Sequence, residues 1–594
     1  MKRKDVLKFL ETEKEVSLQG LYKEFEASGK SSQKRLRHIL HDLEREGIVQ
    51  FADDRVVVKG QKKQKKKSKA SPSVEPKEKK SAKTYRRSTL REDGKRKNYE
   101  ASEDFDYILD VHHIRKDFPP KALAQAEAIP AEIPSKEIAN RLDLRQEMIF
   151  TIDGPDAKDL DDAVSIKRTP TGWELGVHIA DVSYYVPKHS PLDKEALKRG
   201  NSFYFINRVV PMFPEKLSNG LCSLNPHEDR LTMSVIMEVN RKGEVTKYQI
   251  VPSIIHSQYR LTYPQVESVL KGNTIMPDEK LQKSLLEMNE LFRLLHEKRI
   301  REGSIDFDFR EQKCELNEWD EPVKFWLKER LDAERLIEEF MLLANQTVAR
   351  FLSEKTEYAM YRVHEEPEEE KLKSFLAMAL RFGYKFRTHT PPPPQELQRL
   401  LEAVKGKPYQ ELLNQMLLRS MQQARYQNEN LGHYGLGFEY YTHFTSPIRR
   451  YADLTVHRLV KTHLGIAKIS YTDKELATIA NHISKQERVA MEAEREFYKI
   501  KSVRYMQGKE GMEFDAVISG VTSFGLFVSI RETGIEGLVR LADLPDYFVY
   551  HEESHSVVGK RTKKMYQMGQ SVRVRLVRAN VKKQHIDFEL VEEE

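Results

Sequence analysis

The sequence has few cysteines and no long apolar run. Its two cysteines, Cys222 and Cys314, lack the spacing of metal ligands or of a disulfide framework, so we expect reduced thiols in or near a core. No stretch is apolar enough to span a bilayer, and the charged start MKRKDVLKFLE does not resemble a signal peptide. These absences argue against a secreted or membrane protein. We therefore expect a multidomain, cytoplasmic protein with no membrane partner.

Basic charge is concentrated in one segment. The net charge of the 594 residues is +7, but residues 61–97 hold sixteen lysines or arginines and four acids, so the rest of the chain is net negative. This Lys-, Ser- and Pro-rich segment has no apolar period, which predicts a disordered linker over residues 61–98. It would attract phosphates by counterion release, without sequence preference. The alternative is a solvated tail that only keeps the protein soluble.

Acidic residues are concentrated elsewhere. Five aspartates fall within ten residues of the stretch TIDGPDAKDLDDAVS, at positions 153, 156, 159, 161 and 162. The stretch connects two predicted strands, 147–152 and 163–167. Clustered carboxylates repel one another unless a divalent cation or arginines lie between them, and ligands that are all oxygen favour Mg²⁺. Such a site suits phosphodiester hydrolysis, because Mg²⁺ keeps positions for phosphate oxygens and a water. The alternative is an acidic surface loop.

Hydrophobic periodicity organises the centre of the chain. It predicts a strand over residues 173–181, a short helix over 191–200, and long helices over 281–301, 333–354 and 471–507. The acidic stretch therefore belongs to a large mixed α/β region.

Four motifs carry a resemblance to a known family. TIDGPDAKDLDDAVS is followed by LGVHIADVSYYV, by PMFPEKLSNGLCSLNP and, much later, by HFTSPIRRYADLTVHR. In this order they resemble the motifs of the RNB-domain exoribonucleases, the family of ribonuclease II and ribonuclease R. The resemblance implies an RNB catalytic domain over residues 138–509 that uses Mg²⁺ to hydrolyse single-stranded and structured RNA processively. The reaction would run from 3′ ends to nucleoside 5′-monophosphates, with the ribosome and other RNA-processing proteins as further candidate partners.

The resemblance also implies roles for individual acids. Asp153 and Asp162 match direct Mg²⁺ ligands, and Asp159 matches a supporting one. Asp161 matches the carboxylate that positions or deprotonates the attacking water. Asp156 is left as a solvated loop residue.

Arginine and aromatic residues complete the implied site. Arg449 matches the arginine that grips the scissile phosphate, and Arg450 is the alternative. A structural pairing of Arg449 with Asp453 is the competing interpretation. Glu494 matches a glutamate near the 3′ end of the substrate, with a solvated position on a charged helix as its alternative.

Two tyrosines match an aromatic clamp that stacks on the terminal nucleotides, namely Tyr204 and Tyr358. Tyr361 is the alternative to Tyr358. The competing interpretation for these side chains is simple core packing.

Further domains are predicted at both ends. Residues 1–60 are typical of a winged helix, with 31–45 as the recognition helix and protein docking as an equal alternative to nucleic-acid contact. Residues 510–594 resemble an S1 domain, an OB-type barrel of five strands. Phe524 and Phe527 of this domain would stack on bases, unless strand alternation places Phe527 in the core.

The chain departs from the family between these domains. Ribonuclease R normally carries two cold-shock barrels before its RNB domain, but residues 61–137 leave no room for the pair. We interpret residues 99–137 as a connecting segment with the remnant of a cold-shock region, including a strand over 105–113 and a helix over 119–128. The predicted fold class is multidomain α+β. The alternative functions are a non-catalytic RNA-binding regulator with an RNB-like core and a DNA-binding factor led by the winged helix.

Overall fold

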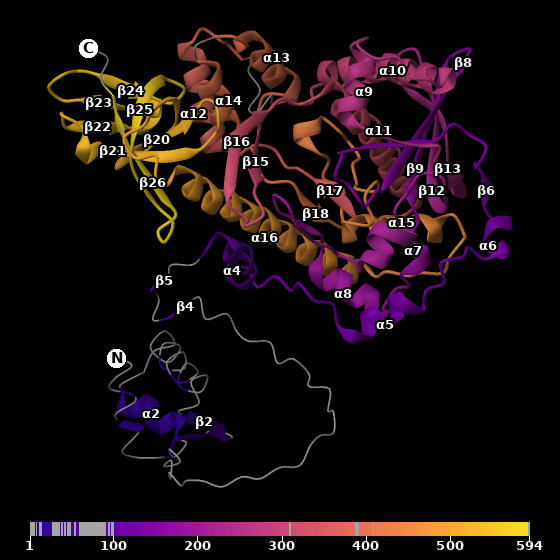
Figure 1. Ribbon diagram of the computed structural model, residues 1–594, viewed down its shortest axis with the longest axis horizontal. Coiled ribbons are helices and arrows are strands. Elements are labelled where there is room, and N and C mark those ends of the chain that lie inside the picture. Colours follow the sequence, from indigo (N-terminus) through magenta and orange to yellow (C-terminus); the bar gives the residue numbers. More distant parts are fainter. Residues whose placement is uncertain are drawn as a thin grey trace. The chain divides into compact units, whose positions relative to one another are not determined.

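The computed structural model divides into two compact units, Met1–Arg86 and Arg87–Glu594, which are described separately (Figure 1). It describes residues 100–591 except 308–309, 387–390 and 408, together with 91–92, 95–96 and parts of 1–58. Apart from the two short strands β4 (Arg91–Glu92) and β5 (Lys95–Arg96), the predicted linker over 61–98 lies outside the described residues.

The first unit contains a small antiparallel sheet. Its strands β1 (Glu15–Ser17), β2 (Val49–Ala52) and β3 (Arg55–Val58) are ordered β1-β3-β2, and β2 and β3 pair as an antiparallel hairpin. Helix α2 (Leu18–Glu24) begins at Ser17, whose hydroxyl accepts a hydrogen bond from the Gly20 amide. Most of the predicted recognition helix lies outside the described residues.

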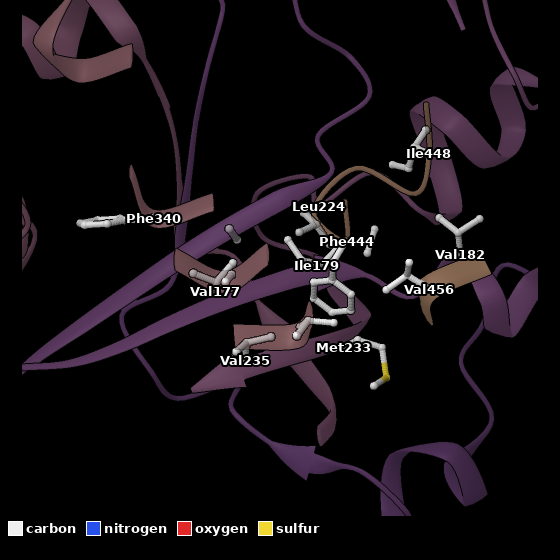
Figure 2. Packing of buried hydrophobic residues seen from close by; sticks show 14 of the residues in the cluster. Val177, Ile179, Val182, Leu224, Met233, Val235, Phe340, Phe444, Ile448 and Val456 are labelled. Carbon is white, nitrogen blue, oxygen red and sulfur yellow. The ribbon is translucent and has the colours of Figure 1, made fainter. Parts of the chain in front are cut away.

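A seven-stranded sheet forms the centre of the second unit, in the order β14-β7-β8-β9-β12-β13-β6. The bounds are β6 (Leu142–Asp143), β7 (Phe150–Asp153), β8 (Asp162–Thr169), β9 (Gly172–Ala180), β12 (Asp229–Asn240), β13 (Val245–His256) and β14 (Tyr259–Thr262). Consecutive residues from Leu175 to Ala180 are buried, so β9 is covered on both faces. Figure 2 shows Val177 and Ile179 of this strand beside Val235 of β12 and Phe444, which follows much later in the chain.

Long helices pack beside this sheet (Figure 1). They are α10 (Glu279–Glu302), α11 (Asp332–Lys355), α15 (Tyr451–His463) and α16 (Asp473–Met506), together with the shorter α8 (Pro191–Arg199) and α9 (Tyr263–Leu270). Helices α8, α10, α11 and α16 confirm the four predicted helices of this region, whereas α9 and α15 were not predicted. In the part of the chain that the structure describes, no helix is long and apolar enough to cross a membrane.

The carboxyl-terminal domain is a closed barrel in the order β19-β20-β21-β26-β25, which confirms the five predicted strands. Their bounds are β19 (Glu513–Val521), β20 (Gly525–Ile530), β21 (Glu536–Arg540), β25 (Ser571–Asn580) and β26 (His585–Leu590). The barrel shares a hydrophobic core with α12 (Glu369–Arg381), α13 (Pro394–Val404) and α14 (Gln410–Ser420). Arg419 of α14 also donates to the Ser519 carbonyl at 3.2 Å. The barrel is therefore packed against helices of the preceding region.

The strand predicted over residues 105–113 is wrong, because this segment is helix α4 (Asp104–Val111). Phe105, Ile108 and Leu109 follow helical spacing and are buried, and Phe105 packs edge to face on Phe205. In the described residues 100–137 the regular elements are helical, including α5 (Pro120–Ala128), which confirms the helix predicted there. The segment therefore shows no strand of a cold-shock barrel.

A buried ion pair fastens α4 to α16. Asp104 and Lys501 are fully buried, and Lys501 Nζ donates to Asp104 Oδ2 and to the carbonyls of Ala101 and Asp320, all within 2.9 Å. Arg504 also pairs with Asp104.

We predict that Lys501→Met lowers the free energy of unfolding by about 3 kcal/mol, because it removes one partner of a buried charge and leaves two carbonyls without a donor. Urea unfolding measures the change. Lys499→Met, on the exposed face of the same helix, is the matched control. A loss below about 1 kcal/mol, in the range of surface ion pairs, would contradict a structural role for the pair.

Candidate active site

The acidic loop lies between two strands of the central sheet. Asp153 ends β7, opposite Thr262 of β14, and Asp162 begins β8, opposite Ile179 of β9. The buried Leu160 anchors the loop between them, since its amide donates to Ser223 Oγ at 3.1 Å. The acids therefore occupy fixed positions at the edge of the core.

Asp161 is the most buried acid of the loop, with 4% of its surface exposed. Its Oδ1 accepts a hydrogen bond from the Ile448 amide at 2.8 Å, and its Oδ2 lies 3.8 Å from Arg449 Nε. Burial raises the pKa of Asp161 well above its usual range, although Arg449 and the Ile448 amide oppose that rise. The Ile448 amide and Arg449 thus hold the Asp161 carboxylate at the junction of the acidic loop and the arginine loop.

The neighbouring acids repel one another. Burial and the charges of Asp162 and Asp159 raise the pKa of Asp153 to about 8. Burial also raises the pKa of Asp162 to about 6. Tyr204 donates its hydroxyl hydrogen to Asp159 Oδ2 at 2.6 Å, so the loop is tied to the predicted clamp residue.

The donor chemistry of this loop fits a divalent cation. Asp153 Oδ2 and Asp161 Oδ2 are buried without a hydrogen-bond partner, a costly state for a carboxylate oxygen that a cation would relieve. In the part of the chain that the structure describes, however, no three acidic, histidine or cysteine side chains are already spaced as a metal site. Cation binding would therefore require some of these side chains to rotate.

The loop after Phe444 supplies two arginines with different partners. Arg450 is held by the buried Asp453, through Nε–Oδ2 at 2.8 Å and Nη2–Oδ1 at 2.7 Å. The competing interpretation that Arg449 pairs with Asp453 is therefore wrong. The Arg449 side chain is 44% exposed and donates to Ser446 Oγ at 3.2 Å. Arg449 is thus the arginine that can turn toward a phosphate.

These residues surround one cavity of about 470 Å³. Besides the predicted Tyr204, four aspartates and two arginines, its walls include polar residues that the sequence analysis missed, namely Tyr263, Glu334, Glu338, Asn345 and Tyr441. Glu334, Glu338 and Asn345 are four and seven residues apart on α11 and therefore share one face of it. This polar stripe on a largely buried helix was visible in the sequence. Tyr263 follows β14, and only the pairing of β14 with β7 brings it to Asp153.

Other predicted site residues lie outside this cavity. Tyr358 packs against the main core, and its alternative Tyr361 is buried in it. Glu494 is exposed on α16. The structure therefore does not place Tyr358 or Glu494 beside the acids, because Tyr358 packs on the main core and Glu494 lies on the exposed face of α16.

The two S1 phenylalanines lie together on the barrel surface. Phe524 is 58% exposed and meets Phe527 edge to face, with ring centroids 6.1 Å apart. On β20 the buried side chains are Leu526, Val528 and Ile530, so strand alternation leaves Phe527 only half-buried.

An acid-lined cavity with an arginine in its wall, joined to an OB-type barrel, is typical of proteins that bind and cleave nucleic acids. The RNB domain model matches residues 141–466, and the S1 RNA binding domain model matches residues 508–590. The chain belongs to the RNB-domain exoribonuclease family, in its ribonuclease R branch.

Relatives support this membership. Ribonuclease R 1 of Lactococcus lactis is 45% identical over 497 residues, and ribonuclease R of Aquifex aeolicus is 43% identical over 494. Both alignments cover 82% of this chain, and they cover 61% and 70% of the respective relatives. Mycoplasma genitalium RNase R, solved with ribose-methylated single-stranded RNA, has a TM-score of 0.79 at 30% identity, covering 84% of this chain and 79% of its own.

A buried histidine supports the arginine loop and makes it sensitive to acid. His457 Nε2 donates to the Phe444 carbonyl at 2.9 Å, and burial lowers the pKa of His457 to about 4. As the pH falls, His457 is therefore protonated near pH 6.5 in the unfolded state but only near pH 4 in the folded state.

We therefore predict that the free energy of unfolding falls by about 3 kcal/mol as the pH decreases from 6.5 to 4 through this residue. His457→Gln keeps a donor but does not titrate, so its stability should decline less over the same interval. Urea unfolding at pH 7, 5.5 and 4.5 measures both proteins. Parallel pH curves would show that another group is responsible.

Proposed function

We propose that this protein is a Mg²⁺-dependent exoribonuclease that degrades single-stranded RNA from the 3′ end to nucleoside 5′-monophosphates. The observation that carries the proposal is the approach of Arg449 to the buried Asp161 within an acid-lined cavity. Membership of the ribonuclease R branch supports RNA as the substrate. The two free, buried cysteines agree with the reducing cytoplasm, where we place the activity.

Asp153 and Asp162 are the acids that would hold Mg²⁺, with Asp159 in support. When bound, the ion would supply positive charge to a phosphate oxygen and lower the pKa of a water. Its binding should also relieve the repulsion that raises the pKa of Asp153.

The chain's own groups divide the remaining work. Asp161 Oδ2 would accept the proton of the attacking water, because Asp161 lines the cavity and this oxygen has no hydrogen-bond partner. The Arg449 guanidinium would bind the scissile phosphate and stabilise the charge that develops on it. The Tyr204 ring, which is 36% exposed, would stack on the terminal base while its hydroxyl orients Asp159.

A non-catalytic RNA-binding regulator is the alternative. Yeast Ssd1, described as a pseudonuclease, has a TM-score of 0.63 at 22% identity, which shows a shared fold alone. The four acids and Arg449 lining one cavity favour an enzyme.

We predict that Asp161→Asn lowers kcat on a 3′-labelled RNA at least 100-fold, because the water loses its proton acceptor. RNA affinity should stay equal or rise, since one charge that repels phosphate is gone. Asp156→Asn, an exposed acid of the same loop, is the matched control and should keep its activity.

The same assay tests the reaction class. Hydrolysis should stop in EDTA, return with Mg²⁺ and release 5′-monophosphates. Products with 3′-phosphates, or full activity in EDTA, would refute the proposed chemistry. Normal turnover by Asp161→Asn would assign the proton acceptor to another residue.

Deletion of residues 61–97 tests the role of the basic segment. This removes a net charge of +12, so RNA affinity should fall and its salt dependence should become shallower. We predict that kcat on a saturating short RNA hardly changes, because lost uniform binding raises KM alone. A severe loss of kcat at constant KM would instead show that the segment orders part of the active site.

A further inference from the structure

The S1 domain carries a second sheet outside its barrel. The antiparallel strands β22 (Phe548–His551), β23 (Ser556–Gly559) and β24 (Met565–Gln567) form this sheet (Figure 1). In the sequence they follow β21 and precede β25. The loop KRTKK, residues 560–564, joins β23 to β24 and is exposed throughout. We refer to Lys560, Arg561 and Lys563 of this loop, together with Tyr547, as the basic tip.

A carboxylate fixes the conformation of the loop. Asp546 Oδ2 accepts hydrogen bonds from the Thr562 amide and hydroxyl, both at 2.7 Å, and from the Arg561 amide at 3.1 Å. Gly559 is required beside them, because a Cβ would come within 2.5 Å of Asp546 Oδ2. Asp546 therefore fixes the backbone of the loop, and its carboxylate accepts hydrogen bonds from amides and a hydroxyl.

The cations of the tip differ from those of the barrel. Four barrel arginines are neutralised by acids: Arg573 and Arg575 pair with Glu513, and Arg540 and Arg578 pair with Asp587. Among the residues that the structure describes, no carboxylate forms an ion pair with Lys560, Arg561 or Lys563. The tip therefore presents positive charge to solvent without a paired carboxylate, in contrast to these four barrel arginines.

An exposed aromatic ring accompanies these cations. Tyr547 is 69% exposed, and Lys560 Nζ lies 4.7 Å from its ring centroid. The Lys560 amide donates to the Tyr547 carbonyl at 2.8 Å, so the ring and the loop are joined through the backbone. A ring for stacking beside several cations is the combination that binds single-stranded nucleic acid with little sequence preference.

We propose that the basic tip is a second RNA-binding site of the S1 domain, in addition to Phe524 and Phe527. Backbone phosphates of a single strand contact Lys560, Arg561 and Lys563, and one base stacks on Tyr547. Because Asp546 and Gly559 already fix the loop, binding orders little additional chain. The proposal rests on RNA as the substrate but not on catalysis.

The test measures affinity for a 20-nucleotide oligouridylate against salt concentration, in the full chain with Asp161→Asn to prevent turnover. Replacing Lys560, Arg561 and Lys563 together by alanine should make the slope of log K against log[salt] shallower by about 2, since each lost phosphate contact on a single strand contributes about 0.7. Replacement by Arg, Lys and Arg, respectively, keeps the charge and should keep the slope.

A matched triple replaces three other exposed S1 cations by alanine, namely Arg531, Lys582 and Lys583. It changes the net charge equally and should alter the slope by less than about 0.7, one phosphate contact. Equal slopes for the tip triple and the unmodified chain would overturn the proposal and leave the tip for a protein partner. Equal losses in both triples would also overturn it, because domain charge alone would then explain binding.

Two single changes test the geometry without removing cations. Tyr547→Leu should weaken RNA binding about tenfold and leave the salt slope unchanged, as expected for stacking. Gly559→Ala should weaken binding at constant charge by displacing Asp546. Unchanged affinity in both variants would refute the proposed contacts.

A second readout separates this site from the proposed activity. With Asp161 intact, the tip triple should keep its kcat on a saturating tetranucleotide and raise KM only for long RNA. If the unmodified chain binds RNA through the tip but hydrolyses none, the proposed function fails and the binding site stands.

Discussion

The active site depends on one buried carboxylate that joins two distant parts of the chain. Asp161 and Ile448 are separated by 287 positions, yet the Ile448 amide donates directly to Asp161 Oδ1. Removing a carboxylate from water costs several kcal/mol unless hydrogen bonds and opposite charge offset it. The Ile448 amide and the nearby Arg449 provide both. The acidic loop and the arginine loop therefore fold as one site.

The arginine loop is shaped by the pairing of its neighbour. Asp453 is fully buried and accepts from the Ser446 amide and from two nitrogens of Arg450. Because Asp453 is saturated in this way, Arg449 is left to face the cavity. Two adjacent arginines thus have different surroundings: Arg450 is paired with Asp453 and holds the loop in place, whereas Arg449 lines the cavity.

Periodicity predicted strands β7, β8 and β9, helices α8, α10, α11 and α16 and the barrel, and the family motifs pointed to the four acids and Arg449 that line the cavity. Local patterns failed where tertiary partners decide the outcome. The apolar run at 105–113 was interpreted as a strand, but the pairing of Asp104 with Lys501 and the packing of Phe105 on Phe205 stabilise a helix. Tyr263 reaches the acids through the β14–β7 pairing alone. The resemblance matched Tyr358 to the clamp, whereas in the structure it packs on the core and does not line the cavity.

Electrostatics requires the cavity and the RNA-binding surfaces to be separate. The cavity wall carries Asp153, Asp159, Asp161, Asp162, Glu334 and Glu338 against two arginines, and Arg450 is already paired with Asp453. Without a cation such a cavity repels phosphates, so it cannot by itself draw in a polyanion. Attraction has to come from charges far enough away not to neutralise the acids. The barrel packs against α12, α13 and α14 through a shared core. This packing holds the S1 surface at a fixed place, separate from the acids, within the unit that contains the cavity. The proposed binding surface and the proposed cleavage site therefore lie in one unit but on different elements.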